Sequence, residues 1–260
     1  RLSVVVGVVF MAVGFAGSAQ AIAADEWIPL FDGESLAGWK VAEHADSIRV
    51  EEGAIVCHGP RAHAYYVGDV ENGDFRNFEL KAQVRTSPGA NSGIYFHTEY
   101  EESGYPKKGY EAQINNTFTG HGGYHEFRKT GSLYGVRDVY KSIARDDEWC
   151  TMRIRVVGKR IRILVNETLL VDYTEPDQPV RIDRRSARRL GQGTFALKCH
   201  DPESKVAFKE ICVKPLADDL AEPAAELPVR DERYAQILEL QMRGFPLVDL
   251  HVHLKGGLTL

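Results

Sequence analysis

The stretch Asn91-Ser92-Gly93-Ile94-Tyr95-Phe96-His97-Thr98-Glu99 predicts a β-strand on which the rest of the fold depends. Side chains in a strand point alternately to opposite faces, and this stretch alternates in the same way. The apolar face, which is expected to pack in a core, carries Ile94, Phe96 and Thr98. The opposite face is expected to carry Tyr95, His97 and Glu99.

A second strand is predicted by Gly109-Tyr110-Glu111-Ala112-Gln113-Ile114-Asn115, with residues 101–108 as the connection. Alternation places Glu111, Gln113 and Asn115 on one face. If the two strands pair as neighbours, these side chains join Tyr95, His97 and Glu99 in one surface, which we call the polar floor. Buried polar groups need partners, so the polar floor is the first candidate for a functional site. A solvated face of an antiparallel sheet is the alternative interpretation.

Short alternating segments continue on both sides of these two strands. Residues 48–58 predict a hairpin that turns at Glu52-Gly53, and residues 78–84 predict a half-buried strand. Residues 151–173 predict a meander, and two more strands are expected over residues 193–200 and 206–213. About ten short strands, with no long amphipathic helix before residue 230, favour an all-β sandwich of two sheets.

The charge balance argues against one class of partner. The chain has 32 Lys and Arg against 37 Asp and Glu, with a net charge of -5. Nucleic-acid-binding surfaces are usually basic, so we expect no nucleic-acid partner.

Residues 1–24 have the three-part form of a secretory signal peptide. A basic start precedes an apolar run over residues 4–15, and the small residues Ala19-Gln20-Ala21 follow. The fold is therefore expected to begin near Asp25, in an exported protein that is periplasmic, extracellular or at the cell surface. An amino-terminal membrane anchor is the alternative, but the apolar run is shorter than the ~20 residues that a span needs. No stable membrane span is expected after signal cleavage.

The composition changes after Pro215. Residues 216–230 predict a linker, and residues 231–260 predict the start of a second domain with a helix over 231–243. His251 and His253 follow on a predicted strand, where both side chains point the same way, as two metal ligands would. A coincidental histidine pair on a surface strand is the alternative.

Four cysteines, Cys57, Cys150, Cys199 and Cys212, remain in the predicted mature chain. An even number in an exported protein is consistent with two disulfides. Each cysteine also stands in an apolar, strand-like context and lacks the spacing of a zinc site, so buried free thiols are equally consistent.

Several separate motifs follow one order along residues 26–215. They are Leu30-Phe31-Asp32-Gly33, Leu36-Ala37-Gly38-Trp39, Asn91-Ser92-Gly93-Ile94-Tyr95-Phe96, Gly109-Tyr110-Glu111-Ala112-Gln113-Ile114, Gly131-Ser132-Leu133-Tyr134-Gly135, Glu148-Trp149, Ala196-Leu197-Lys198-Cys199-His200 and Val206-Ala207-Phe208-Lys209-Glu210-Ile211. Together they resemble the 3-keto-disaccharide hydrolase domain family. The resemblance implies a concanavalin A-like jelly roll over residues 25–215 that acts on an oligosaccharide or glycoside. Residues 245–254 resemble the first strand of amidohydrolase-type, metal-dependent hydrolases.

The resemblance implies cleavage of 3-keto-glycosides by removal of the C2 proton, elimination of the leaving group and addition of water. His97 and Glu111 are the expected acid/base residues. The expected substrate-binding residues are Tyr95, Glu99, Gln113, Lys198 and His200. A divalent metal ion bound by His and Glu could share the stabilisation of the anion, and the other cofactors are unknown.

Two features leave other functions open. Lys198 stands where members of that family often have Gln, so the resemblance also allows a changed specificity or a lost activity. The jelly roll could instead be a non-catalytic carbohydrate-binding module attached to a downstream metal-dependent hydrolase, since a fold does not by itself specify a function. A conventional endoglucanase is a weaker alternative, because the chain has no E-x-D-x-x-E strand.

Overall fold

A computed structural model describes residues 26–179, 188–223 and 243 of the chain. The predicted signal peptide and the His251-His253 pair therefore lie outside the described residues. Within the described part, no helix is both long enough and apolar enough to cross a membrane.

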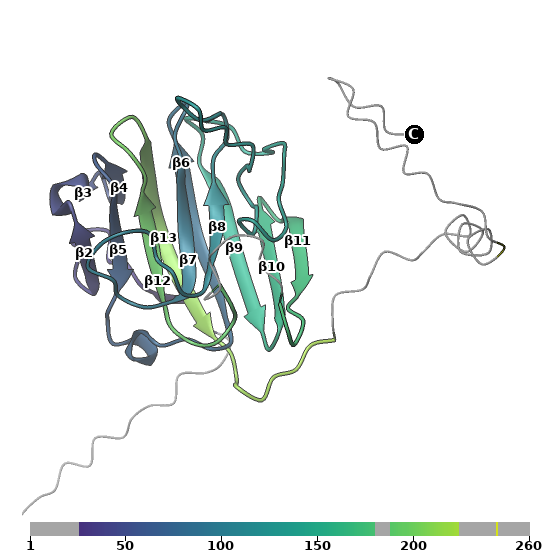
Figure 1. Ribbon diagram of the computed structural model, residues 1–260. Helices are drawn as coiled ribbons and strands as arrows, with labels where there is room; N and C mark the ends of the chain where they lie inside the picture. The colour runs from purple at the N-terminus through teal and green to yellow at the C-terminus, as the bar shows by residue number, and fades with distance from the viewer. Residues whose placement is uncertain (1–25, 180–187, 224–242, 244–260) are drawn as a thin grey trace, which may run out of the picture.

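Two antiparallel sheets pack face to face in a jelly-roll sandwich (Figure 1), as the sequence predicts. The larger sheet has the order β11 (Thr168–Thr174), β10 (Arg160–Val165), β9 (Cys150–Val157), β6 (Phe78–Thr86), β13 (Lys205–Pro215), β4 (Ala54–His58) and β3 (Ile48–Glu51), with β1 (Ile28–Pro29) paired to β13. The smaller sheet has the order β2 (Trp39–Glu43), β5 (Ala62–Tyr66), β12 (Thr194–Cys199), β7 (Ser92–Thr98) and β8 (Tyr110–Ile114). Two short 3-10 helices, η1 (Ala45–Ser47) and η2 (Val70–Gly73), lie between strands.

The core lies between the two sheets and is rich in aromatic side chains. In β10, buried and half-buried residues alternate along the whole strand, so one face packs inward and the other stays accessible. Phe78 of the larger sheet makes edge-on contacts with Phe96 and Phe195 of the smaller one, with ring centroids 6.0 and 4.9 Å apart. Such contacts add to the burial energy and fix how the sheets meet.

Four strands of the smaller sheet differ from the larger sheet because both of their faces are covered. Every residue of β5, β7, β8 and β12 is buried. The predicted hairpin, meander and paired strands are confirmed, whereas β2 and β5 were missed. β5 reads Ala-His-Ala-Tyr-Tyr, and its small and polar residues hide the alternation.

The four cysteines are free thiols, three buried and Cys212 partly buried. Burial raises the pKa of the Cys150 thiol to about 11. Of the two alternatives, the structure has free thiols and no disulfide among these four cysteines.

The alternation of β7 breaks at His97. The two steps of β12 from Thr194 to Ala196 lie opposite the three steps of β7 from Thr98 to Tyr95, so β7 carries an extra residue in a β-bulge. His97 adopts a φ of +54°, in the left-handed region. Its ring packs edge-on against Phe78 with centroids 5.5 Å apart, which places it on the core side of the sheet. The prediction that His97 and Glu111 face one pocket is therefore wrong.

Gly109, just before β8, gives the bulge the room that it needs. Its φ is +76°, and a Cβ atom there would overlap the carbonyl oxygens of Phe96 and His97. Gly104 has a similar φ of +87° but no atom within 4 Å of a Cβ.

We predict that Gly109→Ala destabilises the fold by at least about 2 kcal/mol more than Gly104→Ala. Both substitutions have the cost of a positive φ, roughly 1 kcal/mol, but only the first also forces two backbone carbonyls apart. Urea unfolding of the two variants measures the difference. Equal losses would show that the chain at His97 relaxes freely.

Residues 216–223, which we call the strap, pack on the larger sheet. The Leu216 amide donates to the Asn77 carbonyl at 2.9 Å, and the Asn77 side-chain amide donates to Ala217 at 2.8 Å. Farther along, Glu222 accepts from Arg155 and from Arg162, each at 2.6 Å. Within the predicted linker, residues 216–223 therefore lie against the larger sheet, where the Glu222 carboxylate neutralises arginines of β9 and β10. The predicted linker boundaries remain untested.

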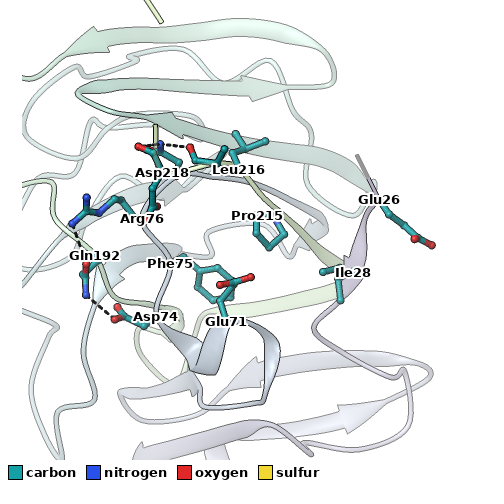
Figure 2. Close-up of a pocket in the computed structure, with 12 residues that line it drawn as sticks. Glu26, Ile28, Glu71, Asp74, Phe75, Arg76, Gln192, Pro215, Leu216 and Asp218 are labelled. Carbon is teal, nitrogen blue, oxygen red and sulfur yellow. Dashed lines mark hydrogen bonds between the residues drawn. The ribbon is translucent and has the colours of Figure 1, made fainter. Parts of the chain in front are cut away.

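A groove of about 560 Å³ lies where the strap meets η2 and β1 (Figure 2). Its polar side chains largely bind one another: Arg76 donates to Gln192 at 3.4 Å, and Gln192 donates to Asp74 at 2.8 Å. These hydrogen bonds join the chain segments that meet at the groove.

We predict that Glu222→Gln lowers the free energy of unfolding by about 1 kcal/mol, because Arg162 loses its carboxylate partner. Thermal unfolding should show a loss of about 2–4 °C in Tm. Glu34→Gln, an exposed carboxylate without an ion pair among the described residues, is the matched control. If the two variants were equally stable, the ion pairs of Glu222 would contribute nothing to the stability of the fold.

Candidate functional site

A cavity of about 330 Å³ opens on the face of the smaller sheet that points away from the core. Strands β7, β8 and β12 form its floor, and loops form its walls. Its lining residues are Asn91, Tyr95, Tyr105, Glu111, His121, Tyr124, Glu126, Tyr134, Arg188, Lys198 and His200. Two cavities of about 560 and 590 Å³ lie elsewhere. The smaller cavity is the candidate site because buried acids, bases and cations converge in it, as in catalytic pockets.

Glu111 lies at the centre of the floor and is only 2% exposed. It sits opposite Tyr95 in the register of β7 and β8, so the two side chains share a face. Lys198 donates to one carboxylate oxygen, and Arg188 approaches the other at 3.6 Å. Arg188 also lies over the Tyr95 ring, 5.4 Å from its centroid. A single buried carboxylate is thus held between two cations.

The two cations decide the protonation of Glu111. Burial alone would raise its pKa, but the charges of Lys198 and Arg188 outweigh burial and hold the pKa below its usual value. Glu111 is therefore ionised at neutral pH.

Gly93 makes space for this carboxylate. A Cβ atom at position 93 would lie 2.6 Å from Oε1 of Glu111. The strand can place an acid against its neighbour because the neighbour has no side chain there.

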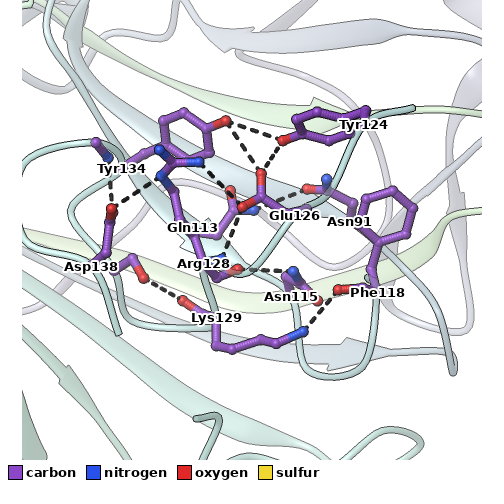
Figure 3. Close-up of polar contacts among 12 residues, drawn as sticks. Asn91, Gln113, Asn115, Phe118, Tyr124, Glu126, Arg128, Lys129, Tyr134 and Asp138 are labelled. Carbon is purple, nitrogen blue, oxygen red and sulfur yellow. Dashed lines mark hydrogen bonds and ion pairs between the residues drawn. The ribbon is translucent and has the colours of Figure 1, made fainter. Parts of the chain in front are cut away.

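A polar network forms one wall of the cavity (Figure 3). The buried Glu126 accepts hydrogen bonds from the hydroxyls of Tyr124 and Tyr134, the latter at 3.2 Å, and from the amide of Arg128 at 2.9 Å. Arg128 also pairs with Asp138 at 3.2 Å. The backbone of residues 130–134 bonds along β8; for instance, the Tyr134 amide donates to the Glu111 carbonyl at 2.9 Å. The network therefore fixes Tyr134 beside Glu111.

The opposite wall is Tyr105, from the loop between β7 and β8. Arg61 lies over its ring, 5.0 Å from the centroid. Arg61 also forms a two-point ion pair with Glu43 of β2, at 2.9 and 2.7 Å, and Glu43 accepts from the Gly104 amide at 3.1 Å. This ion pair anchors the loop to the sheet.

Beneath Tyr105 lies His63, which is fully buried and pairs in register with Lys198. Burial, followed by the charge of Lys198, lowers the pKa of His63 to about 3. The ring is uncharged at neutral pH and packs between Tyr95 and Tyr105, with centroids 5.7 Å from each.

His200 lines the outer part of the cavity at the end of β12. Its Nδ1 lies 2.5 Å from Oδ2 of Asp201. Tyr105 and Phe118 flank the imidazole, with centroids 6.0 and 5.9 Å away.

The structure brings together four of the predicted site residues, Glu111, Tyr95, Lys198 and His200. Gln113 is buried beside Lys198 rather than in the lining. Glu99 lies beyond the bulge, where its side chain is 64% exposed and pairs with Lys108 at 3.2 Å. Its predicted place on the polar floor is therefore wrong, because β7 ends at Thr98.

His97 is held by the backbone instead of facing the cavity. Its Nε2 lies 2.8 Å from the Arg76 carbonyl, and its Nδ1 accepts from the Gly191 amide at 3.2 Å. Burial lowers its pKa to about 4, so it is neutral at pH 7. A catalytic role for His97 remains an untested prediction.

Sequence reasoning missed Arg188 and the loop tyrosines 105, 124 and 134. Arg188 lies in the arginine-rich stretch of residues 181–189, which looks like a solvated segment. Tyr134 could have been found from the sequence, because it belongs to the Gly131–Gly135 motif that carries the family resemblance.

The described residues contain no group of three or more His, Cys, Asp or Glu side chains arranged to hold a metal ion. The expected divalent ion therefore remains a prediction.

Comparison with known proteins points to one family. Residues 26–214 match the model of the 3-keto-alpha-glucoside-1,2-lyase-like domain. A crystal structure of a candidate glycosyl hydrolase from Parabacteroides distasonis has a TM-score of 0.63 and 21% sequence identity, over 75% of this chain and 95% of that one. A second from the same organism has a TM-score of 0.56 and 20% identity, over 74% and 100%. At such identities these structures support the fold alone. No curated protein matches the chain.

We predict a pH-dependent contribution of the Glu43 ion pair to stability. Hydrogen bonding to Arg61 lowers the pKa of Glu43 from 4.5 to about 2. The unfolded chain takes up the proton first as the pH falls, so the contribution is complete above pH 4.5 and is lost between there and about pH 2.

The measurement is the Tm of the wild type and of Glu43→Gln between pH 6 and 2. The two curves should differ most near pH 6 and converge at low pH, whereas Glu102→Gln, in the same loop, should follow the wild type. A constant difference across this range would contradict the prediction.

Proposed function

The chain belongs to the family of 3-keto-alpha-glucoside-1,2-lyase-like domains, and on this premise we propose that its Glu111 pocket cleaves the glycosidic bond of 3-keto-glycosides. The reaction is removal of the C2 proton, elimination of the group on C1 and addition of water. The observation that carries the proposal is the ionised, buried carboxylate between two cations in a pocket of about 330 Å³.

The substrate ketone at C3 makes this chemistry accessible. Loss of the C2 proton gives an enolate whose negative charge rests on the ketone oxygen. The C1–O bond then breaks as a C1–C2 double bond forms. The pocket must supply a base and a stabiliser of the enolate oxygen, rather than the two opposed carboxylates of most glycosidases.

Glu111 is the proposed base. It is ionised at neutral pH and can therefore accept a proton. Its lowered pKa makes Glu111 a weak base in the ligand-free pocket. The cations that lower this pKa also stabilise the negative charge that forms on the substrate, and this offsets the weak basicity. As the proton moves from C2 to Glu111, the negative charge moves to the substrate oxygen.

Lys198 and Arg188 are the proposed stabilisers of that oxygen. If it lies between them, they lose the carboxylate charge and gain the enolate charge in one step. The pocket then holds nearly constant net charge during proton transfer, which is favourable in a site of low dielectric.

The remaining steps balance the reaction. The departing oxygen takes up a proton, for which the hydroxyls of Tyr124 and Tyr134 are candidate donors. Water then adds its oxygen to C1 and releases one proton, which balances the proton that the tyrosine hydroxyl must regain. Glu111 returns the C2 proton to C2. The net result is hydrolysis, with Glu111 restored.

We predict that Glu111→Gln lowers turnover of a 3-keto-disaccharide by about a hundredfold or more, because the amide cannot take the C2 proton. Product formation by the purified domain is followed by NMR, with the unoxidised disaccharide as the negative substrate. Glu99→Gln, an exposed carboxylate outside the pocket, is the matched control and should retain wild-type turnover.

Circular dichroism checks that both variants are folded. Saturable binding of the sugar without turnover by the wild type would favour the carbohydrate-binding module. Near-normal turnover by Glu111→Gln would place the base elsewhere.

A further inference from the structure

We propose that His200, oriented by Asp201, is a second catalytic group, the base that activates water for addition to C1. The inference rests on the proposed function and assigns to this chain a distinct half-reaction, which would make it a hydrolase rather than only an eliminating enzyme.

The His200–Asp201 pair has the geometry of an oriented base. Nδ1 of His200 lies 2.5 Å from Oδ2 of Asp201, so the carboxylate accepts the Nδ1 proton. The Nε2 atom then carries the free lone pair. Among the described residues no hydrogen bond to Nε2 is found, and the ring borders the same cavity as Glu111.

Asp201 is itself held rigidly. Its Oδ1 accepts from the amides of Glu203 and Ser204, at 2.9 and 2.8 Å, and its Oδ2 accepts from the Ser204 hydroxyl at 3.1 Å. The carboxylate therefore cannot turn away from the imidazole. A base held by a third group in this way is the arrangement that activates nucleophiles in other enzymes.

The position of the ring also suits a base that acts on water. The side chain of His200 is 16% exposed, so it stands at the mouth of the cavity, whereas Glu111 lies at the bottom. Tyr105 and Phe118 flank the imidazole and limit its rotation. Water can reach Nε2 from the solvent side while the sugar occupies the floor.

The charges that face His200 keep it uncharged. Burial and the charge of Lys198 lower its pKa, and they outweigh Asp201 and Glu111, which act in the opposite direction. The pKa of His200 stays below its usual value, so at neutral pH the imidazole is uncharged. Its Nε2 can accept a proton but does not carry one to donate. This state suits the water-adding step better than protonation of the leaving group.

The step balances as follows. The water oxygen bonds to C1 of the unsaturated ketone, and Nε2 takes one of its protons. The electron pair of the C1–C2 double bond passes to the enolate, and C2 then receives the proton held by Glu111. The imidazolium releases its proton to solvent, which replaces the proton taken up by the departing oxygen.

The test separates elimination from hydration. Wild type, His200→Gln and, as a matched control, His58→Gln at the exposed end of β4 are incubated with a 3-keto-disaccharide. Released aglycone, the unsaturated ketone and the hydrated sugar are measured by NMR over time. We expect His200→Gln to release the aglycone while the ratio of hydrated sugar to unsaturated ketone falls at least about tenfold.

Asp201→Asn provides an independent second variant, because it retains the shape of the pair but favours the other tautomer. It should lower the same ratio, and it replaces His200→Gln if that variant does not fold. Loss of aglycone release together with hydration, or an unchanged ratio in both folded variants, would overturn the assignment. So would a wild type that stops at the unsaturated ketone. A wild type with no turnover at all would instead refute the proposed function.

Discussion

The interaction on which the site depends is the buried charge cluster of Glu111, Lys198 and Arg188. Removing a carboxylate from water is costly unless cations and hydrogen bonds replace the solvent. Here the replacements come from β12 and from the chain between β11 and β12, so the cluster ties two distant parts of the sequence to one point on β8. All three side chains are buried, and they line the cavity on the outer face of the smaller sheet.

The fold could be predicted largely from the sequence, because each strand carries its own local signal. Alternation along β6 and β8, and the short turns of the β9–β11 meander, are properties of neighbouring residues. The pairing of β7 with β8 could also be predicted from the sequence, since each strand has one polar face and the two faces match. β5 was missed because it is buried on both faces and shows no polar alternation.

The site was only partly predictable. Glu111 and Tyr95 could be placed because they precede the bulge, where the period of two still holds. At His97 the extra residue reverses the faces, and no Gly or Pro next to His97 in β7 indicates this bulge; the constraint comes from Gly109, just before β8. Arg188 enters the pocket only through tertiary packing, 77 positions away from Glu111, so no local pattern could reveal it.

The absence of a side chain at Gly93 has a consequence for how this fold diversifies. Gly93 lies inside a regular strand without a positive φ, so an alanine there is compatible with the backbone. It would nevertheless push the Glu111 carboxylate off its two cations. Evolution can therefore abandon the chemistry through one small substitution while the sandwich persists. Among sequences that share this architecture, the residue at this position should help to distinguish lineages that retain a working carboxylate from those that have turned the same face into a surface for binding alone.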